Sequence, residues 1–174
     1  MSPRALGLLV AAATLVADQA SKLVMLFVVR IGERPPIRVA PFFDLTLVWN
    51  RGISYGLFQQ HEDAGRWALV ALSVAAAIGL GVWLGRAQGR LLGLALGLLI
   101  GGALGNALDR AVYGAVADFV LLYWIPFFPY VFNVADSAIV AGVGLLLYDS
   151  LVLEGRRRPP SAAVGGPVGP GADA

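Results

Sequence analysis

The sequence predicts an all-α membrane protein with a small β element: four transmembrane helices and a β-rich connector outside the membrane. Of the 174 residues, 58% are hydrophobic and 14% are charged, and the mean hydropathy is +0.75. A soluble domain carries about 25% charged residues. The chain therefore has too few charges for a surface that faces water everywhere, and we expect it to reside in a membrane.

Four apolar segments are the candidate membrane-spanning helices. They cover residues 5–29, 67–85, 91–108 and 131–153. Each approaches the roughly 20 residues that cross a bilayer, and backbone groups in lipid must bond within their own segment, which favours helices. The second and third segments hold no charge, whereas the first contains Asp18 and Lys22 and the fourth contains Asp136 and Asp149.

The first segment could alternatively be a cleaved signal peptide. Arg4 and the apolar run 6–16 resemble the charged and hydrophobic regions of such a peptide. Asp18 and Gln19 interrupt the region where a small-residue cleavage site would follow. A retained helix is therefore the favoured interpretation.

Basic residues indicate the orientation. Arg86 and Arg90 flank the short link between the second and third segments, Arg4 precedes the first, and the tail carries arginines at 156–158. An even number of spans places these regions on one side, which the positive-inside rule predicts to be cytoplasmic. The opposing connector also contains arginines, so this pattern is not uniform; they are Arg30, Arg34, Arg38 and Arg51.

The connector 30–66 is expected to contain structure. Apolar and other residues alternate over 43–49 (FDLTLVW), the period of a half-buried strand, and 114–124 (GAVADFVLLYW) also resembles a strand. Both lie on the outer side, so a small sheet at the membrane surface is predicted. Residues 1–154 are expected to form one membrane domain, and the Pro-, Gly- and Ala-rich residues 155–174 a disordered cytoplasmic tail.

Composition excludes several kinds of chemistry. The chain has no cysteine and a single histidine, His61, so thiolate chemistry and most zinc or Ser-His schemes are not expected. A net charge of +2 offers no basic face for nucleic acid.

Residues 52–56 (GISYG) match the G-x-S-x-G pattern around Ser54, but a glycine-rich turn is the favoured interpretation. A Ser-Lys dyad with Lys22 is less favoured, because Asp18 precedes Lys22 by one helical turn and can pair with it.

Carboxylates near the outer ends of the apolar segments are the candidate functional groups. They are Asp18, Asp109, Asp118 and Asp136. A charge inside a membrane costs about 2.5–3.5 kcal/mol on insertion scales, so such residues persist through pairing or function. Asp18 has Lys22 and Asp109 adjoins Arg110, whereas Asp118 and Asp136 have no evident cation.

Asp118 and Asp136 each end a V-A-D triplet, and so does Asp18. If the fold brings Asp118 and Asp136 together, burial and repulsion would leave one shared proton on the pair, the arrangement of an aspartic peptidase. The alternative is a structural role at helix ends, with Asn133 or Asp136 as the N-cap of the fourth helix.

Five motifs occur in order along the chain. They are Asp18-Gln19-x-Ser21-Lys22, Asn50-x-Gly52-x-Ser54-x-Gly56, Gly105-Asn106-x-x-Asp109-Arg110, Val116-x-Asp118-Phe119 and Phe132-Asn133-x-Ala135-Asp136-Ser137. Together they closely resemble the lipoprotein signal peptidases, also called signal peptidase II, over residues 5–153. Ser54 stands where many relatives have alanine.

The resemblance implies a bacterial inner-membrane aspartic endopeptidase with four helices and an outer β-cradle, needing no cofactor or metal. Its substrates would be prolipoproteins that carry diacylglycerol on a cysteine and are cut just before it. Asp118 and Asp136 would form the catalytic dyad at the outer, periplasmic face. The remaining residues that match the family's substrate-binding or supporting positions are Asn50, Gly52, Asn106, Asp109, Arg110, Asn133, Asp18 and Lys22.

Within these positions, the resemblance assigns Asn50 and Arg110 to the substrate backbone and Asp18 and Lys22 to support of the site. It also implies contact with membrane lipid, a monomeric state and inhibition by the peptide antibiotic globomycin. Two other functions remain to be distinguished: a proton-coupled small membrane transporter, since intramembrane carboxylates also relay protons, and a non-catalytic scaffold.

Overall fold

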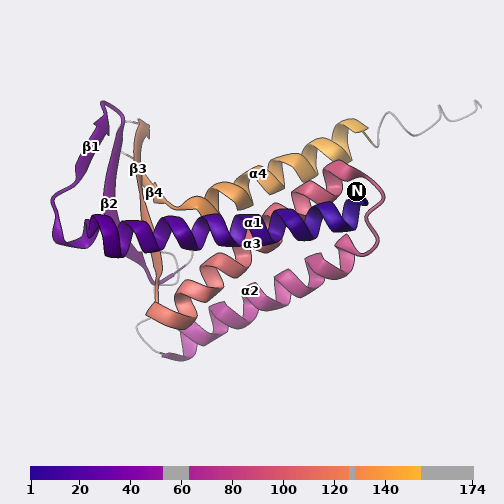
Figure 1. Ribbon diagram of the computed structural model, residues 1–174, viewed down its shortest axis with the longest axis horizontal. Helices are drawn as coiled ribbons and strands as arrows, with labels where there is room; N and C mark the ends of the chain where they lie inside the picture. Colours follow the sequence, from indigo (N-terminus) through magenta and orange to yellow (C-terminus); the bar gives the residue numbers. More distant parts are fainter. Residues whose placement is uncertain (53–62, 126–127, 154–174) are drawn as a thin grey trace, which may run out of the picture.

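Four long helices stand side by side, and a small sheet lies across one end of them. A computed structural model describes residues 1–52, 63–125 and 128–153 (Figure 1). The helices are α1 (Pro3–Leu23), α2 (Asp63–Leu84), α3 (Arg90–Tyr113) and α4 (Val134–Tyr148). Wider π-helical turns, η1 (Val24–Val29) and η4 (Asp149–Leu153), extend α1 and α4, and the 3-10 turn η2 (Ile31–Glu33) follows η1. In the described residues, four helices are long and apolar enough to cross a membrane, as the sequence predicts.

Local sequence explains where these helices begin and end. The Ser2 hydroxyl accepts a hydrogen bond from the Ala5 amide at 3.2 Å, and Pro3 occupies the first turn of α1. Gly114 ends α3 with a φ of 81°, a conformation that glycine adopts without the steric cost of a Cβ atom. Arg30 follows η1 with a φ of 54° and so turns the chain toward the sheet.

Helix α3 is the central helix. In its most apolar stretch 61% of the residues are buried, against 11–17% for the other three spans. Large apolar side chains point outward from the surrounding helices, among them Leu72 of α2 and Val140 of α4, which are 63% and 67% exposed. Such surfaces are suited to lipid rather than to water.

Small residues allow the helices to approach α3 closely. A Cβ atom on Gly97 would lie 2.5 Å from the Gly7 carbonyl oxygen of α1, and one on Gly101 would lie 2.6 Å from the Ala11 carbonyl oxygen. On the side facing α4, a Cβ atom on Gly102 would lie 2.6 Å from the Ala135 carbonyl oxygen. Packing between small residues is a usual source of helix association in membranes.

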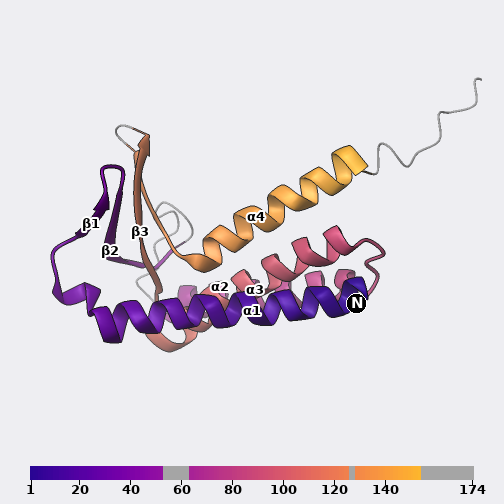
Figure 2. The ribbon, with the colours of Figure 1, turned by 45° about the horizontal axis from the view of Figure 1, so that its top comes forward.

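The sheet contains four antiparallel strands in the order β1 (Ile37–Ala40), β2 (Phe43–Asn50), β3 (Val116–Ile125) and β4 (Phe128–Phe132). Figure 2 shows it at the end of the helices opposite the N-terminus. The two predicted strands are confirmed as β2 and β3. The sequence analysis did not predict β1 and β4, because both are short and prolines obscure their pattern: Pro36 and Pro41 flank β1, and Pro129 lies within β4.

Two predicted boundaries are wrong. The fourth helix begins at Val134 rather than at residue 131, because the preceding residues form β4 (Phe128–Phe132), and α3 continues to Tyr113 rather than ending near residue 108. Asp109 and Arg110 lie beyond the predicted end of the span, but both are buried within the helix. Their charges find partners inside the protein, which removes the reason to stop the helix at the first charge. The tail prediction for 155–174 lies outside the described residues.

Candidate active site

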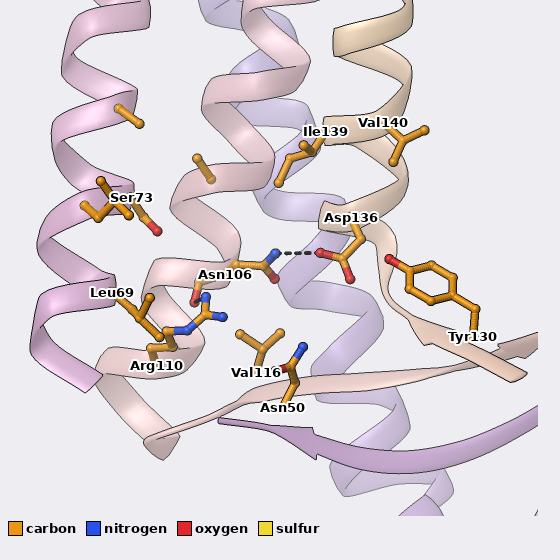
Figure 3. Close-up of a pocket in the computed structure, with 13 residues that line it drawn as sticks. Asn50, Leu69, Ser73, Asn106, Arg110, Val116, Tyr130, Asp136, Ile139 and Val140 are labelled. Carbon is orange, nitrogen blue, oxygen red and sulfur yellow. Dashed lines mark hydrogen bonds between the residues drawn. The ribbon is translucent and has the colours of Figure 1, made fainter. Parts of the chain in front are cut away.

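Asp118 and Asp136 approach the same site from different elements. Asp118 lies on β3 opposite Val48 of β2, and Asp136 lies in the first turn of α4. The Asp118 carboxylate accepts hydrogen bonds from Asn133 Nδ2 at 2.7 Å and from Asn50 Nδ2 at 3.2 Å. The Asp136 carboxylate accepts one from Asn106 Nδ2 at 2.8 Å (Figure 3).

Asn133 connects the two aspartates. Its Oδ1 accepts a hydrogen bond from the Asp136 amide at 2.9 Å, so Asn133 is the N-cap of α4, as one of the two alternatives predicted. Its Nδ2 donates to Asp118 and, at 3.1 Å, to Asn106 Oδ1. Asn106 in turn donates to Asp136, so two asparagine side chains bridge the carboxylates.

The environment of Asp118 favours its protonated form. Burial is the largest cause and the negative charge of Asp136 the second, and together they raise the pKa of Asp118 to about 7. The hydrogen bonds from Asn50 and Asn133 and the charge of Lys22 oppose this rise, because they stabilise the carboxylate. Near neutral pH the site can therefore hold one proton on two interacting carboxyl groups.

A buried ion-pair triad lies behind the site. Lys22 Nζ is 2.8 Å from Asp18 Oδ2 and 2.8 Å from Asp109 Oδ2. The predicted Asp18–Lys22 pair is confirmed. Asp109 adjoins Arg110 in the sequence, but adjacent helical residues point in different directions, and Asp109 pairs with Lys22 of α1 instead. The same contacts engage the Lys22 ammonium, which leaves the Ser-Lys scheme without support.

The triad also holds the backbone beside each of the two aspartates. Asp18 Oδ1 accepts a hydrogen bond from the Ala135 amide at 2.9 Å, and Asp109 Oδ2 accepts one from the Ala117 amide at 3.1 Å. Each alanine immediately precedes one of the paired aspartates, and both are fully buried. The V-A-D triplets 116–118 and 134–136 thus combine a small residue that fits under a carboxylate with an aspartate that faces the site.

Gln19 belongs to this group, although the sequence interpretation did not select it as a site residue. Its Nε2 donates to Asp109 Oδ1 at 2.9 Å and to Asp18 Oδ2 at 3.1 Å. A polar residue next to Asp18 in an apolar segment was the available signal. Gln19 adds neutral donors to two carboxylates that share one lysine.

Arg110 is held by backbone carbonyls. Its Nη2 donates to the Gly52 carbonyl oxygen at 2.6 Å and its Nη1 to the Asn106 carbonyl oxygen at 3.4 Å. Asn50 Oδ1 accepts a hydrogen bond from the Gly52 amide at 3.1 Å. These hydrogen bonds therefore hold the end of β2 and the residues just after it against α3, beside Asp118.

A pocket of about 320 Å³ opens in front of these groups (Figure 3). Four polar side chains gather at one end of it, namely Asn50, Asn106, Arg110 and Asp136, and Ser73 and Tyr130 add hydroxyl groups to the lining. Apolar side chains of α2 and α4, such as Leu69 and Ile139, line the remainder. The structure thus brings all ten predicted site residues into one connected region, whereas Ser54 and His61 lie outside the described residues.

The fold and the site define a multi-pass membrane protein with paired, partly buried carboxylates of the kind that aspartic peptidases use. A family model described as signal peptidase (SPase) II matches residues 10–152. The chain belongs to the signal peptidase II family.

Individual relatives agree with this assignment. A lipoprotein signal peptidase of Methylobacterium radiotolerans is 59% identical over 168 residues, which cover 97% of this chain and 98% of that protein. A lipoprotein signal peptidase of Methylocella silvestris is 58% identical over 87% of this chain and 88% of that protein. The transporter and scaffold alternatives receive no support from these relatives.

Solved structures show the same architecture. A bacterial membrane enzyme structure obtained by the in meso method at 2.3 Å resolution has a TM-score of 0.76 and 26% identity, covering 90% of this chain and 93% of that one. A second, at 1.9 Å resolution, has a TM-score of 0.71 and 27% identity, covering 84% and 92%. The likeness spans the helices and the sheet, so the predicted fold class is confirmed.

Proposed function

We propose that this protein removes the signal peptide from lipid-modified prolipoproteins, with Asp118 and Asp136 as its catalytic pair. The relatives described above are lipoprotein signal peptidases, and such proteins act on prolipoproteins. The observation that carries the catalytic assignment is the bridge of Asn133 and Asn106 between the two carboxylates, beside a pocket with donors for a peptide.

The paired carboxyl groups can divide the work of peptide hydrolysis. The ionised carboxylate takes a proton from water while oxygen attacks the peptide carbonyl, and the protonated carboxyl group donates to the carbonyl oxygen. Collapse of the tetrahedral intermediate breaks the C–N bond, the proton taken from water passes to the leaving amine, and the carboxylate that had donated takes back a hydroxyl proton as the carboxyl product forms. The raised pKa of Asp118 suits it to hold the proton at the start.

Asn50 and Arg110 are placed to align the substrate. Both line the pocket next to Asp136, and Arg110 already binds one peptide carbonyl, that of Gly52. A guanidinium with five donors can hold a second carbonyl from a bound chain. In this proposal Lys22, Asp18 and Asp109 do not touch the substrate and instead keep β3 and α4 in place.

We place the protein in the bacterial inner membrane with the sheet and the active site at the outer face. The arginines around the α2–α3 link favour a cytoplasmic position for the opposite end. At the outer boundary water can reach the scissile bond while the substrate's lipid stays in the bilayer. We further expect a monomer in contact with membrane lipid, and inhibition by globomycin-type peptides.

The test is cleavage of a diacylglyceryl-modified precursor peptide by purified variants. Asp118→Asn and Asp136→Asn should each abolish cleavage, because an amide can neither take the proton from water nor donate as a carboxylic acid. Asp149→Asn is the matched control, since Asp149 is a buried aspartate at the other end of α4 and should keep activity. Turnover in either dyad variant would remove that residue from the catalytic role.

A further inference from the structure

One hydroxyl group faces the active-site pocket from the membrane span α2. That helix contributes four residues to the lining, of which three are apolar and one, Ser73, is polar. Ser73 is also the one residue between Trp67 and Trp83 whose side chain can form a hydrogen bond. In Figure 3 its hydroxyl points away from α2 into the pocket.

This hydroxyl is free to bind a ligand. A serine within a membrane helix can donate to the carbonyl oxygen four residues earlier in its own helix. Within the part of the chain that the structure describes, however, the half-buried side chain of Ser73 forms no hydrogen bond. A hydroxyl that is removed from water without a partner costs free energy, so a carbonyl oxygen entering the pocket would be a favourable partner for it.

Ser73 lies deeper in the membrane span than the other donors of the pocket. At a rise of about 1.5 Å per residue, it is about 15 Å along α2 from Asp63, the end nearest the sheet. Figure 3 shows it farther from the sheet than Asn50 and Arg110. The pocket therefore offers donors at its outer end and one further donor on its inner side.

The wall around Ser73 leaves room for a peptide backbone. Ala76 lies almost one helical turn further along α2, and Ala103 of α3 lines the same pocket. Small side chains at such positions let another main chain approach a helix closely. A substrate can therefore bring its backbone next to the Ser73 hydroxyl.

A peptide that is cut in this pocket needs such a donor. A signal peptide inside the bilayer is helical, and its helix must unwind near the cut bond before the scissile carbonyl group is open to attack. Each carbonyl oxygen released by unwinding lacks both its helical partner and water, so it requires a donor from the protein. Asn50 and Arg110 can serve carbonyl oxygens near the sheet, whereas Ser73 is placed for one further inward.

We propose that the Ser73 hydroxyl donates a hydrogen bond to a backbone carbonyl oxygen of the substrate, on the signal-peptide side of the cut bond. This inference rests on the proposed function, in which the signal peptide runs inward from the cut bond and the lipidated residue lies on the outer side. Ser73 is then a substrate-binding residue that keeps the unwound segment extended along α2.

The first test is Ser73→Ala in the full-length protein, with a diacylglyceryl-modified precursor peptide in nanodiscs. The value of kcat/KM should fall by about three- to tenfold, in line with the loss of one neutral hydrogen bond. The midpoint of thermal unfolding should stay unchanged, because the hydroxyl has no partner within the described part of the protein. Ser150→Ala is the matched control, since it removes the same group from an exposed residue outside the pocket and should cleave like the parent.

The second test locates the bond by means of precursor peptides in which one backbone amide upstream of the cut is replaced by an ester, a weaker acceptor. At the position that faces Ser73, the two changes should not be additive, so Ser73→Ala should lower kcat/KM for the ester peptide much less than for the all-amide peptide. An equal loss for every peptide, parent-like cleavage by Ser73→Ala, or a lowered unfolding midpoint would overturn the assignment. Failure of the parent to cleave the all-amide peptide would instead contradict the proposed function, so the two failures are distinguishable.

Discussion

Asp118 combines burial, a neighbouring carboxylate and two amide donors in one side chain. Its pKa is raised to about 7 because burial and the charge of Asp136 outweigh the hydrogen bonds from Asn50 and Asn133. A carboxyl group in this state can act as an acid near neutral pH. The sequence identifies the carboxylate, whereas the pKa of that carboxylate depends on the groups that the fold brings around it.

The pH dependence of cleavage follows from that balance. Activity should fall as pH rises above about 7, because Asp118 then loses the proton that the carbonyl oxygen must receive. It should also fall at acid pH, where both carboxyl groups are protonated and neither can accept a proton from water. A profile of kcat/KM against pH in purified protein measures both limbs.

Asn50→Ala tests the origin of the alkaline limb. Removing the Asn50 donor takes away a bond that stabilises the ionised form of Asp118, so its pKa should rise and the limb should move to higher pH. The position of the limb is independent of the loss in rate that a substrate contact would cause. A limb that stays in place or moves to lower pH would assign it to another group.

Arg110 is the second residue with a specific geometric requirement. Its two terminal nitrogens reach the carbonyl oxygens of Gly52 and Asn106, which a single ammonium cannot reproduce. Arg110→Lys should lower kcat/KM by roughly tenfold or more, in line with loss of a charge-assisted hydrogen bond of about 1.5–3 kcal/mol. Thermal unfolding should change little, because the positive charge is kept. Parent-like cleavage would show that Arg110 serves only as an anchor.

At the scale of elements, one lysine joins three helices and a strand. Lys22 of α1 pairs with Asp18 and with Asp109 of α3, and these carboxylates hold the first turn of α4 and the start of β3. The two elements that carry Asp118 and Asp136, namely β3 and α4, are therefore positioned by one buried charge cluster. The small residues between α1 and α3 bring the cluster's members within reach.

Lys22→Met should destabilise the protein strongly, since it leaves Asp18 and Asp109 buried without a cation. Loss of one partner from a buried ion pair typically costs about 3–5 kcal/mol. The midpoint of thermal unfolding in detergent should fall, together with cleavage activity. Glu33→Gln is the control, because Glu33 is 73% exposed and lies 3.9 Å from Arg30, so the midpoint should not move. Equal midpoints for the two variants would contradict a structural role for the triad.

At the scale of the whole molecule, the sheet lies at one end of the helices and the α2–α3 link at the other (Figure 2). The chain contains no cysteine, so single cysteines can report which end faces outward. Val39→Cys on β1 and Gln88→Cys in the link are both exposed positions.

We expect a membrane-impermeant thiol reagent to label Val39→Cys in intact spheroplasts. Gln88→Cys should react only after the membrane is opened, which also shows that both sites are accessible to the reagent. The reverse pattern would place the site at the cytoplasmic face. The physical basis of this expectation is the distribution of arginine residues across the connectors.

The four spans, strands β2 and β3 and the candidate carboxylates could be predicted from the sequence alone. Hydropathy over about 20 residues and alternation over seven residues are local properties of the sequence. They predict the fold well because a bilayer requires an apolar helix of about that length, and a half-buried strand requires side chains that alternate between its two faces. The Asp18–Lys22 pair was also predictable, since four residues make one helical turn. The motifs in order along the chain identified the family.

The tertiary structure decided the partners of these groups. Asp18 binds the Ala135 amide across 117 positions of sequence, and Asn50 binds Asp118 across 68. Asp109 pairs with Lys22 rather than with its neighbour Arg110, and Arg110 donates to the Gly52 carbonyl oxygen. Because both charged side chains have partners inside the protein, α3 continues beyond them to Tyr113. Spacing along the chain carries no information about such contacts, because they arise only when helices pack through their small residues and bring distant polar groups into a space without water.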